Sequence, residues 1–141
     1  MEFNKRIKNF WEGEAELYST SIEQELKCFE RQAWKEIILE HAPKKECLEI
    51  LDIGTGPGFF PIILGEEGHH VTGIDLTENM ITYARQNLYK AGVQANLLTM
   101  DCQALEFEDN TFDLIVCRNL TWTLSDPERA YREWYRVLKP H

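Results

Sequence analysis

A glycine-rich turn between a strand and a helix constrains this chain more than any other feature. The apolar run 48–53 is short and partly β-branched, as expected of a buried parallel strand. Gly54, Gly56 and Gly58 follow at alternate positions, where the missing Cβ lets a ligand approach the backbone. Pro61 falls in the first turn of the next helix, where a missing N–H costs little. The turn predicts a hinge that directs amide donors and a helix N-terminus at one polar or anionic ligand group.

A second strand, 71–75, places an acid beside this hinge. Asp75 ends that strand, and in doubly wound folds an acid there accepts hydrogen bonds from a ribose diol. The dinucleotide fingerprint G-x-G-x-x-G would need its third glycine at Phe59, and Pro57 stands within the loop. The spacing therefore favours a nucleoside-bearing ligand other than NAD, and an NAD-type oxidoreductase domain is the weaker alternative.

The hinge followed by Gly73-Ile74-Asp75-Leu76 resembles motifs I and II of class I S-adenosylmethionine-dependent methyltransferases. Near the C-terminus, Arg136-Val137-Leu138-Lys139-Pro140 is similar to the R-V-L-K-P-G-G sequence that ends a helix in that family. The resemblance implies an α/β fold with a Rossmann-like, doubly wound parallel sheet. It also implies S-adenosyl-L-methionine as the cofactor and S-adenosyl-L-homocysteine as the product.

The resemblance further implies how the cofactor would be held. Asp75 would accept from the ribose hydroxyls, and Leu76 would pack on adenine. Asp101 would accept from the adenine amine while the backbone N–H of Cys102 donates to a ring nitrogen; alternatively, Asp101 caps the following turn. Tyr18 would contact the cofactor from an aromatic N-terminal segment. The complete expected cofactor-binding set is Tyr18, Asp52, Gly54, Thr55, Gly56, Gly58, Asp75, Leu76, Met80, Asp101, Cys102 and Asn119.

Four strands are expected, over 48–53, 71–75, 95–100 and 112–117. The resemblance implies that they lie in the spatial order 3-2-1-4 with helices on both faces. The family's glycines and further strands would follow Pro140, so the C-terminal strands are missing. We expect one domain, 1–141, in which 1–42 form an N-terminal helical lid and 43–141 the Rossmann-like core. Ser21 is expected to open the long helix that Pro43 ends. The fourth strand would be an exposed apolar edge, which predicts a homodimer or a piece of a longer protein.

Composition and charge argue against some classes of binding partner. The net charge is −9, and the sequence shows none of the basic patches that nucleic-acid binding requires. The N-terminus has no signal-peptide pattern and no apolar run is long enough to span a membrane, so we expect neither a membrane partner nor export. The four cysteines have no C-x-x-C spacing, which favours reduced thiols in the cytoplasm. We expect no metal site, and His69-His70 is interpreted as a solvated turn.

The expected function is methyl transfer to a small-molecule acceptor. The sequence Arg118-Asn119-Leu120-Thr121 after the fourth strand differs from the N-P-P-Y type of enzymes that methylate amino groups of nucleic acids and glutamine. Methyl transfer depends on holding nucleophile and methyl in line, and no catalytic triad motif is present. The catalytic base is unassigned, with Tyr18, Arg118 and Asn119 as pocket candidates. The alternative is a non-catalytic, cofactor-binding or dimerising module.

Overall fold

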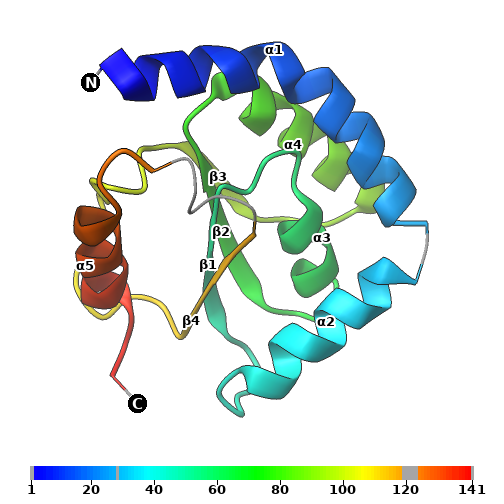
Figure 1. The fold of residues 1–141 in the computed structure, drawn as a ribbon. Helices are drawn as coiled ribbons and strands as arrows, with labels where there is room; N and C mark the ends of the chain where they lie inside the picture. Colours follow the sequence, from blue (N-terminus) through cyan, green and yellow to red (C-terminus); the bar gives the residue numbers. More distant parts are fainter. Residues whose placement is uncertain (1, 28, 119–123, 141) are drawn as a thin grey trace.

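A computed structural model describes residues 2–27, 29–118 and 124–140, with the side chains of Glu2 and Tyr18 excepted, and shows a parallel sheet flanked by helices (Figure 1). In chain order the elements are α1 (Glu2–Glu25), α2 (Glu30–His41), β1 (Glu49–Ile53), α3 (Phe59–Gly65), β2 (His70–Asp75), α4 (Glu78–Ala91), β3 (Asn96–Thr99), β4 (Leu114–Cys117) and α5 (Pro127–Val137). Strand and helix alternate from β1 to β3, an irregular segment joins β3 to β4, and α5 follows; this is the order of a doubly wound α/β fold that lacks one crossover helix.

The four strands lie in the order β3-β2-β1-β4 and pair in parallel throughout. This confirms the predicted order 3-2-1-4. Ile53 of β1 lies opposite both Ile74 of β2 and Cys117 of β4, and Asp75 lies opposite Thr99 of β3. All four strands therefore end at nearly the same level, so the loops that follow them meet at one edge of the sheet.

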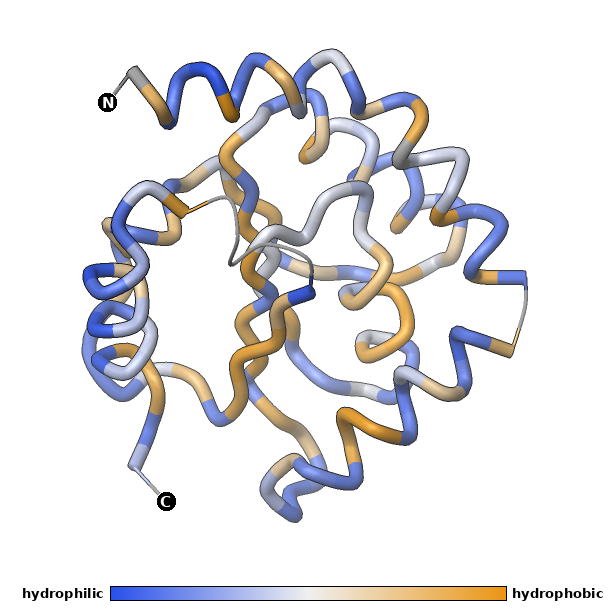
Figure 2. Tube along the Cα trace, viewed as in Figure 1, coloured by the Kyte–Doolittle hydropathy of each residue, from blue (hydrophilic) through white to orange (hydrophobic). Residues whose placement is uncertain are grey.

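The side chains of β1 alternate between two apolar layers, as the pleat of a strand requires. Ile50 packs with Phe59 and Phe60 of α3 and with α2, whereas Leu51 and Ile53 pack with Val137 of α5. Figure 2 shows hydrophobic residues along the central strands and mainly hydrophilic ones along α5. Among the described helices, none combines the length and the hydropathy needed to cross a membrane.

The first helix boundary differs from the prediction. Ser21 lies inside α1, which continues to Glu25, and Phe29 precedes α2 without a side-chain cap. Ala15, Ser19 and Ile22 are buried at helical spacing, so the buried stripe of α1 runs past Ser21 without interruption. Tertiary packing has overridden the local capping signal.

His69 is buried rather than solvated, which corrects the predicted turn. Its Nδ1 accepts a hydrogen bond of 3.0 Å from the backbone N–H of Leu48, next to the start of β1. Burial lowers the pKa of His69, partly offset by the Glu67 carboxylate, and the neutral ring is the form that accepts this bond. Among the described residues, no cluster of His, Cys, Asp and Glu side chains could hold a metal ion.

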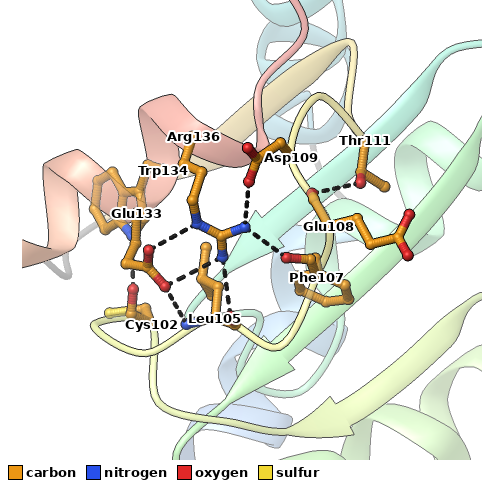
Figure 3. Close-up of polar contacts among 9 residues, drawn as sticks. All are labelled: Cys102, Leu105, Phe107, Glu108, Asp109, Thr111, Glu133, Trp134 and Arg136. Carbon is orange, nitrogen blue, oxygen red and sulfur yellow. Dashed lines mark hydrogen bonds and ion pairs between the residues drawn. The ribbon is translucent and has the colours of Figure 1, made fainter.

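Arg136 fastens α5 to the irregular segment between β3 and β4 (Figure 3). Its Nη1 donates to the Phe107 carbonyl at 2.7 Å and its Nη2 to the Leu105 carbonyl at 3.0 Å. Asp109 and Glu133 both form ion pairs with the same guanidinium at 2.8 Å. The arginine of the R-V-L-K-P sequence thus satisfies backbone carbonyls that no strand or helix would satisfy.

Replacing Arg136 by Lys tests this role. Lysine keeps the charge but lacks the planar fork that serves two carbonyls and two carboxylates at once. We expect Arg136→Lys to lower the urea midpoint measured by circular dichroism. Arg132→Lys is the matched control, because Arg132 pairs with Glu128 only at 3.9 Å and both side chains are exposed. Equal midpoints for both variants would contradict the assignment.

Candidate functional site

A cavity of about 920 Å³ opens at the edge of the sheet where the strands end. Its floor is the loops after β1, β2, β3 and β4, and residues of α1 and α2 form the opposite wall. The structure brings together nine members of the predicted set along this cavity: Asp52, Gly54, Thr55, Gly56, Asp75, Leu76, Met80, Asp101 and Cys102. A volume of this size is typical of a site for a drug-sized ligand or cofactor.

Three members of the predicted set are not placed at the cavity. Gly58 has φ +98°, and a Cβ there would lie 2.8 Å from Leu88 Cδ1 and 3.3 Å from Ala84 Cβ. The close approach at Gly58 is therefore made by α4, which corrects the prediction of ligand contact there. Tyr18 lies in α1 with a side chain outside the described atoms, and Asn119 lies outside the described residues.

The backbone N–H groups of the hinge donate hydrogen bonds to acceptors within the protein. The N–H groups of Gly54 and Thr55 donate to the Ile74 carbonyl at 3.0 and 2.9 Å. Gly56 N–H donates to Asp75 Oδ2 at 2.9 Å, and Gly58 N–H donates to the Thr55 carbonyl at 3.1 Å. These amides, predicted to face a ligand, are all engaged by acceptors of the protein itself in this structure. The glycines are required instead because positions 54, 56 and 58 all have positive φ.

Asp75 braces the hinge from the end of β2. Besides Gly56, its carboxylate accepts hydrogen bonds from the Thr77 N–H at 3.1 Å and the Thr77 hydroxyl at 3.3 Å. Burial raises the pKa of Asp75, against the opposing effect of the Thr77 and Gly56 donors. The carboxylate also lines the cavity, so one group both shapes the loop and faces the ligand space.

Asp52 presents an unsatisfied buried acceptor to the cavity. The residue is 2 % exposed, and within the described part of the chain neither Asp52 Oδ2 nor Thr55 Oγ1 has a hydrogen-bond partner. Burial raises the pKa of Asp52 to about 7; the Thr55 hydroxyl opposes the rise, although its geometry falls short of a hydrogen bond. A buried acceptor of this kind is costly unless a ligand supplies a donor or a cation.

Asp101 caps the turn after β3, which is one of the two roles predicted for it; the other is hydrogen bonding to adenine. Its Oδ1 accepts from the Gln103 N–H at 2.9 Å, while Oδ2 accepts from Asn4 Nδ2 of α1 at 3.3 Å. The neighbouring Cys102 carbonyl accepts from Trp134 Nε1 at 3.1 Å, and burial raises the pKa of the Cys102 thiol to about 12. A thiol of this kind is un-ionised at neutral pH and is not a nucleophile.

Arg118 lies directly after β4, and no sequence pattern distinguishes it from its neighbours. Its guanidinium carbon lies 4.6 Å from the ring centroid of Phe59, 5.4 Å from Phe60 and 5.5 Å from Trp34. Its Nη1 donates to Glu25 Oε2, in the last turn of α1, at 2.8 Å. We call the three rings around Arg118, those of Trp34, Phe59 and Phe60, the aromatic box. Its rings come from α2 and α3, Glu25 comes from α1 and Arg118 follows β4, so no local sequence pattern could reveal this arrangement.

Helix α1 spans the cavity and is attached on both sides of it. Near its start Asn4 reaches Asp101, and at its end Glu25 pairs with Arg118. Between them, Glu12 Oε1 accepts from the backbone N–H of Glu78 at 2.9 Å, at the N-terminus of α4. Figure 1 shows α1 running beside α4 across this end of the sheet.

Comparison with known proteins matches residues 51–141 to the family described as "Methyltransferase domain". The demethylmenaquinone methyltransferase of Thermus thermophilus is 36% identical over 107 residues, covering 74% of this chain and 47% of that protein. The malonyl-[acyl-carrier protein] O-methyltransferase of Erwinia pyrifoliae is 36% identical over 128 residues, covering 89% of this chain and 44% of that protein.

Among solved structures, a SAM dependent methyltransferase from Aquifex aeolicus superposes with a TM-score of 0.65 at 32% identity. That match covers 75% of this chain and 58% of the other. The chain spans a little under half the length of the curated relatives named above, 44–47%.

The raised pKa of Asp52 predicts an unusual pH dependence of stability. Between its ordinary pKa of 3.8 and about 7, the folded protein binds a proton that the unfolded chain releases. Asp52 therefore makes the protein less stable as pH rises through this window. Asp52→Asn should remove this dependence of the unfolding free energy on pH. In urea titrations, the unfolding free energy of the variant relative to that of the parent protein should rise by up to about 4 kcal/mol between pH 4 and pH 8.

Glu108→Gln is the matched control, since Glu108 is an exposed acid away from the cavity. It should leave the pH profile of unfolding unchanged. A constant stability difference between Asp52→Asn and the parent protein across this range would contradict the assignment.

Proposed function

This chain belongs to the methyltransferase domain family, and we propose that it binds S-adenosyl-L-methionine in the cavity and transfers the methyl group to a small-molecule acceptor. The observation that supports this most directly is the convergence of the hinge with Asp75. A positive-φ glycine turn and the acid at the next strand end are joined by a 2.9 Å hydrogen bond and line one cavity.

The residues present fit this cofactor on chemical grounds. The described residues that line the cavity carry one guanidinium and five carboxyl groups, from Glu25, Glu30, Asp52, Asp75 and Asp101. Such a wall favours a ligand with net positive charge, and the cofactor carries a sulfonium and an ammonium group against a single carboxylate. The unpartnered Asp52 Oδ2 at the hinge is an acceptor that the ammonium group would satisfy.

The order of the strands suggests how the cofactor is oriented. Asp101 follows β3, Asp75 follows β2, the hinge follows β1 and Arg118 follows β4. In our proposal Asp75 binds the ribose, Asp101, Cys102, Leu76 and Met80 surround the adenine, and the hinge with Asp52 holds the methionine end. Tyr18 and Asn119 remain candidates for contact with the ligand.

When bound, S-adenosyl-L-methionine supplies an electrophilic methyl group on a sulfonium. The protein's part is to hold the ligands in line and keep water out, which can supply about 7–11 kcal/mol of the barrier. We propose that residues 1–42 act as the lid and residues 43–141 as the core that carries the cofactor. The attachments of α1 at Asp101 and Arg118 support this, because they close the cavity from both sides.

We further propose a small acceptor rather than a nucleic acid, and residence in the cytoplasm. The net charge of −9 and the acidic cavity wall support the first point. Cys47 and Cys102 are free thiols in the structure, which supports the second.

Binding of the cofactor is tested by thermal unfolding with S-adenosyl-L-homocysteine, using NAD as the competing ligand. At one hundred times its dissociation constant, a ligand of the folded state adds about 2.7 kcal/mol. We expect this shift with S-adenosyl-L-homocysteine and none with NAD. Asp75→Asn should weaken binding about ten- to a hundredfold in calorimetry, because charge-assisted hydrogen bonds are lost.

Glu78→Gln is the control for Asp75→Asn, because the Glu78 side chain is exposed and outside the cavity lining. Stabilisation by NAD alone would overturn the proposed cofactor. If the chain binds the cofactor but transfers a methyl group to no acceptor tested, it is a non-catalytic cofactor-binding module.

We also propose that the outer edge of β4 pairs with a second copy of the chain. Within the described residues β4 pairs only with β1, and the parallel bridge between Phe112 and Leu138 covers the outer edge only just before the strand begins. The outer edge of Leu114–Cys117 is therefore available for strand pairing. Light scattering after gel filtration should give twice the chain mass of 16.6 kDa. A single-chain mass at high protein concentration would count against this interface.

A further inference from the structure

We propose that Arg118 binds a carboxylate of the methyl acceptor and that Glu25 occupies its place when the acceptor is absent. The inference rests on the proposed function, because it assigns the acceptor to the part of the cavity next to the methyl donor. It names a substrate class, a small molecule with a carboxylate group, and the residue that selects it.

The position of Arg118 in the sheet is the first argument. Ile53 of β1 pairs with Cys117 of β4, so the next residues along, Gly54 and Arg118, leave the sheet side by side. Asp75 and Asp101 lie on the opposite side of the hinge, after β2 and β3. A cofactor with its nucleoside over β2 and β3 therefore directs its other end toward Arg118, where an acceptor must bind.

The charge of the cavity is the second argument. Of the described residues that line it, Arg118 is the only lysine or arginine, against five acids. Among the described lining residues this guanidinium is the one attractive point for an anionic group, so the carboxylate of the cofactor would compete with that of the acceptor for it. A single cation among acids therefore fixes both the location and the orientation of a carboxylate ligand.

The rigidity of Arg118 is the third argument. Three aromatic rings, those of Phe59, Phe60 and Trp34, lie within 5.5 Å of its guanidinium carbon. Stacking on ring faces occupies the plane of the guanidinium and leaves its edge donors for hydrogen bonds. Only 23% of its side chain is exposed, so the charge is held in a partly desolvated setting where an ion pair is stronger than at the surface.

Glu25 shows that this edge binds a carboxylate. Its Oε2 lies 2.8 Å from Arg118 Nη1, and the side chain comes from the last residue of α1, directly before the turn to α2. A carboxylate at the end of a helix can move aside without disturbing the sheet. Displacing Glu25 by the acceptor would release the end of α1, so that acceptor entry and lid movement are coupled.

Calorimetry with three matched probes tests the proposal on the full chain, with and without saturating S-adenosyl-L-homocysteine. The probes are benzoate, the neutral benzamide and the cationic benzamidine. We expect benzoate to bind about tenfold or more tightly than benzamide, since only benzoate forms the ion pair. Benzamidine should not bind beside Arg118.

Two variants identify the partners. Arg118→Gln should weaken benzoate binding about ten- to a hundredfold. The affinity for S-adenosyl-L-homocysteine, measured in parallel, should fall less than that for benzoate; an equal or larger fall would show that Arg118 binds the carboxylate of the cofactor and would overturn the proposal. Glu25→Gln should strengthen benzoate several-fold, because the internal competitor loses its charge. Glu23→Gln is the matched control on the same helix, since Glu23 pairs with Lys90 outside the cavity at 3.5 Å. Arg132→Gln is the control for loss of an arginine.

The outcomes separate the two proposals. If S-adenosyl-L-homocysteine fails to bind, the proposed function fails, whatever the benzoate titration gives. If it binds but benzoate shows no preference over benzamide, or no dependence on Arg118, the carboxylate site is overturned. Benzamidine binding that increases in Arg118→Gln would show instead that the aromatic box recognises cations and that Arg118 is only its internal occupant.

Discussion

The site depends on the connection between the glycine hinge and the end of the neighbouring strand β2. The Ile74 carbonyl accepts from the amides of Gly54 and Thr55, and the Asp75 carboxylate accepts from Gly56. These bonds fix a turn that only positive-φ residues can form, and they are possible because β1 and β2 end in register. The hinge is therefore a preformed surface, and a ligand meets its carboxylates and bare Cα atoms rather than a row of free amide donors.

The same edge of the sheet concentrates negative charge beneath a helical cover. Asp52 remains without a partner for Oδ2, and its raised pKa reflects the cost of burying that charge. Helix α1 meets this surface through polar contacts near both of its ends, at Asp101 and Arg118. Few of its side chains are buried, so it is held less firmly than the helices that pack on the sheet. A cover of this kind can open while the core stays folded.

Much of this arrangement could be predicted from local pattern. The apolar runs, the hinge and the acids at strand ends predicted the strands, and the family resemblance built on them supplied the sheet order and nine residues that share the cavity. The errors arose where tertiary contacts decide. Ser21 has the chemistry of a helix cap, but α1 continues because Ile22 and Ser19 are buried on either side of it. Gly58 matched a ligand-facing motif, yet Leu88 of α4 is what excludes a side chain there. The aromatic box around Arg118 joins distant segments and has no sequence signature.

The central claim is that the hinge and Asp75 hold the nucleoside-bearing methyl donor at the edge formed by the strand ends. A crystal structure with S-adenosyl-L-homocysteine tests it most directly. The account predicts density for the ribose against the Asp75 carboxylate and for the amino acid end beside Asp52, with the hydrogen bond between Gly56 and Asp75 retained. Density for the ligand away from Asp75, or a hinge rearranged so that its amides bind the ligand, would contradict it.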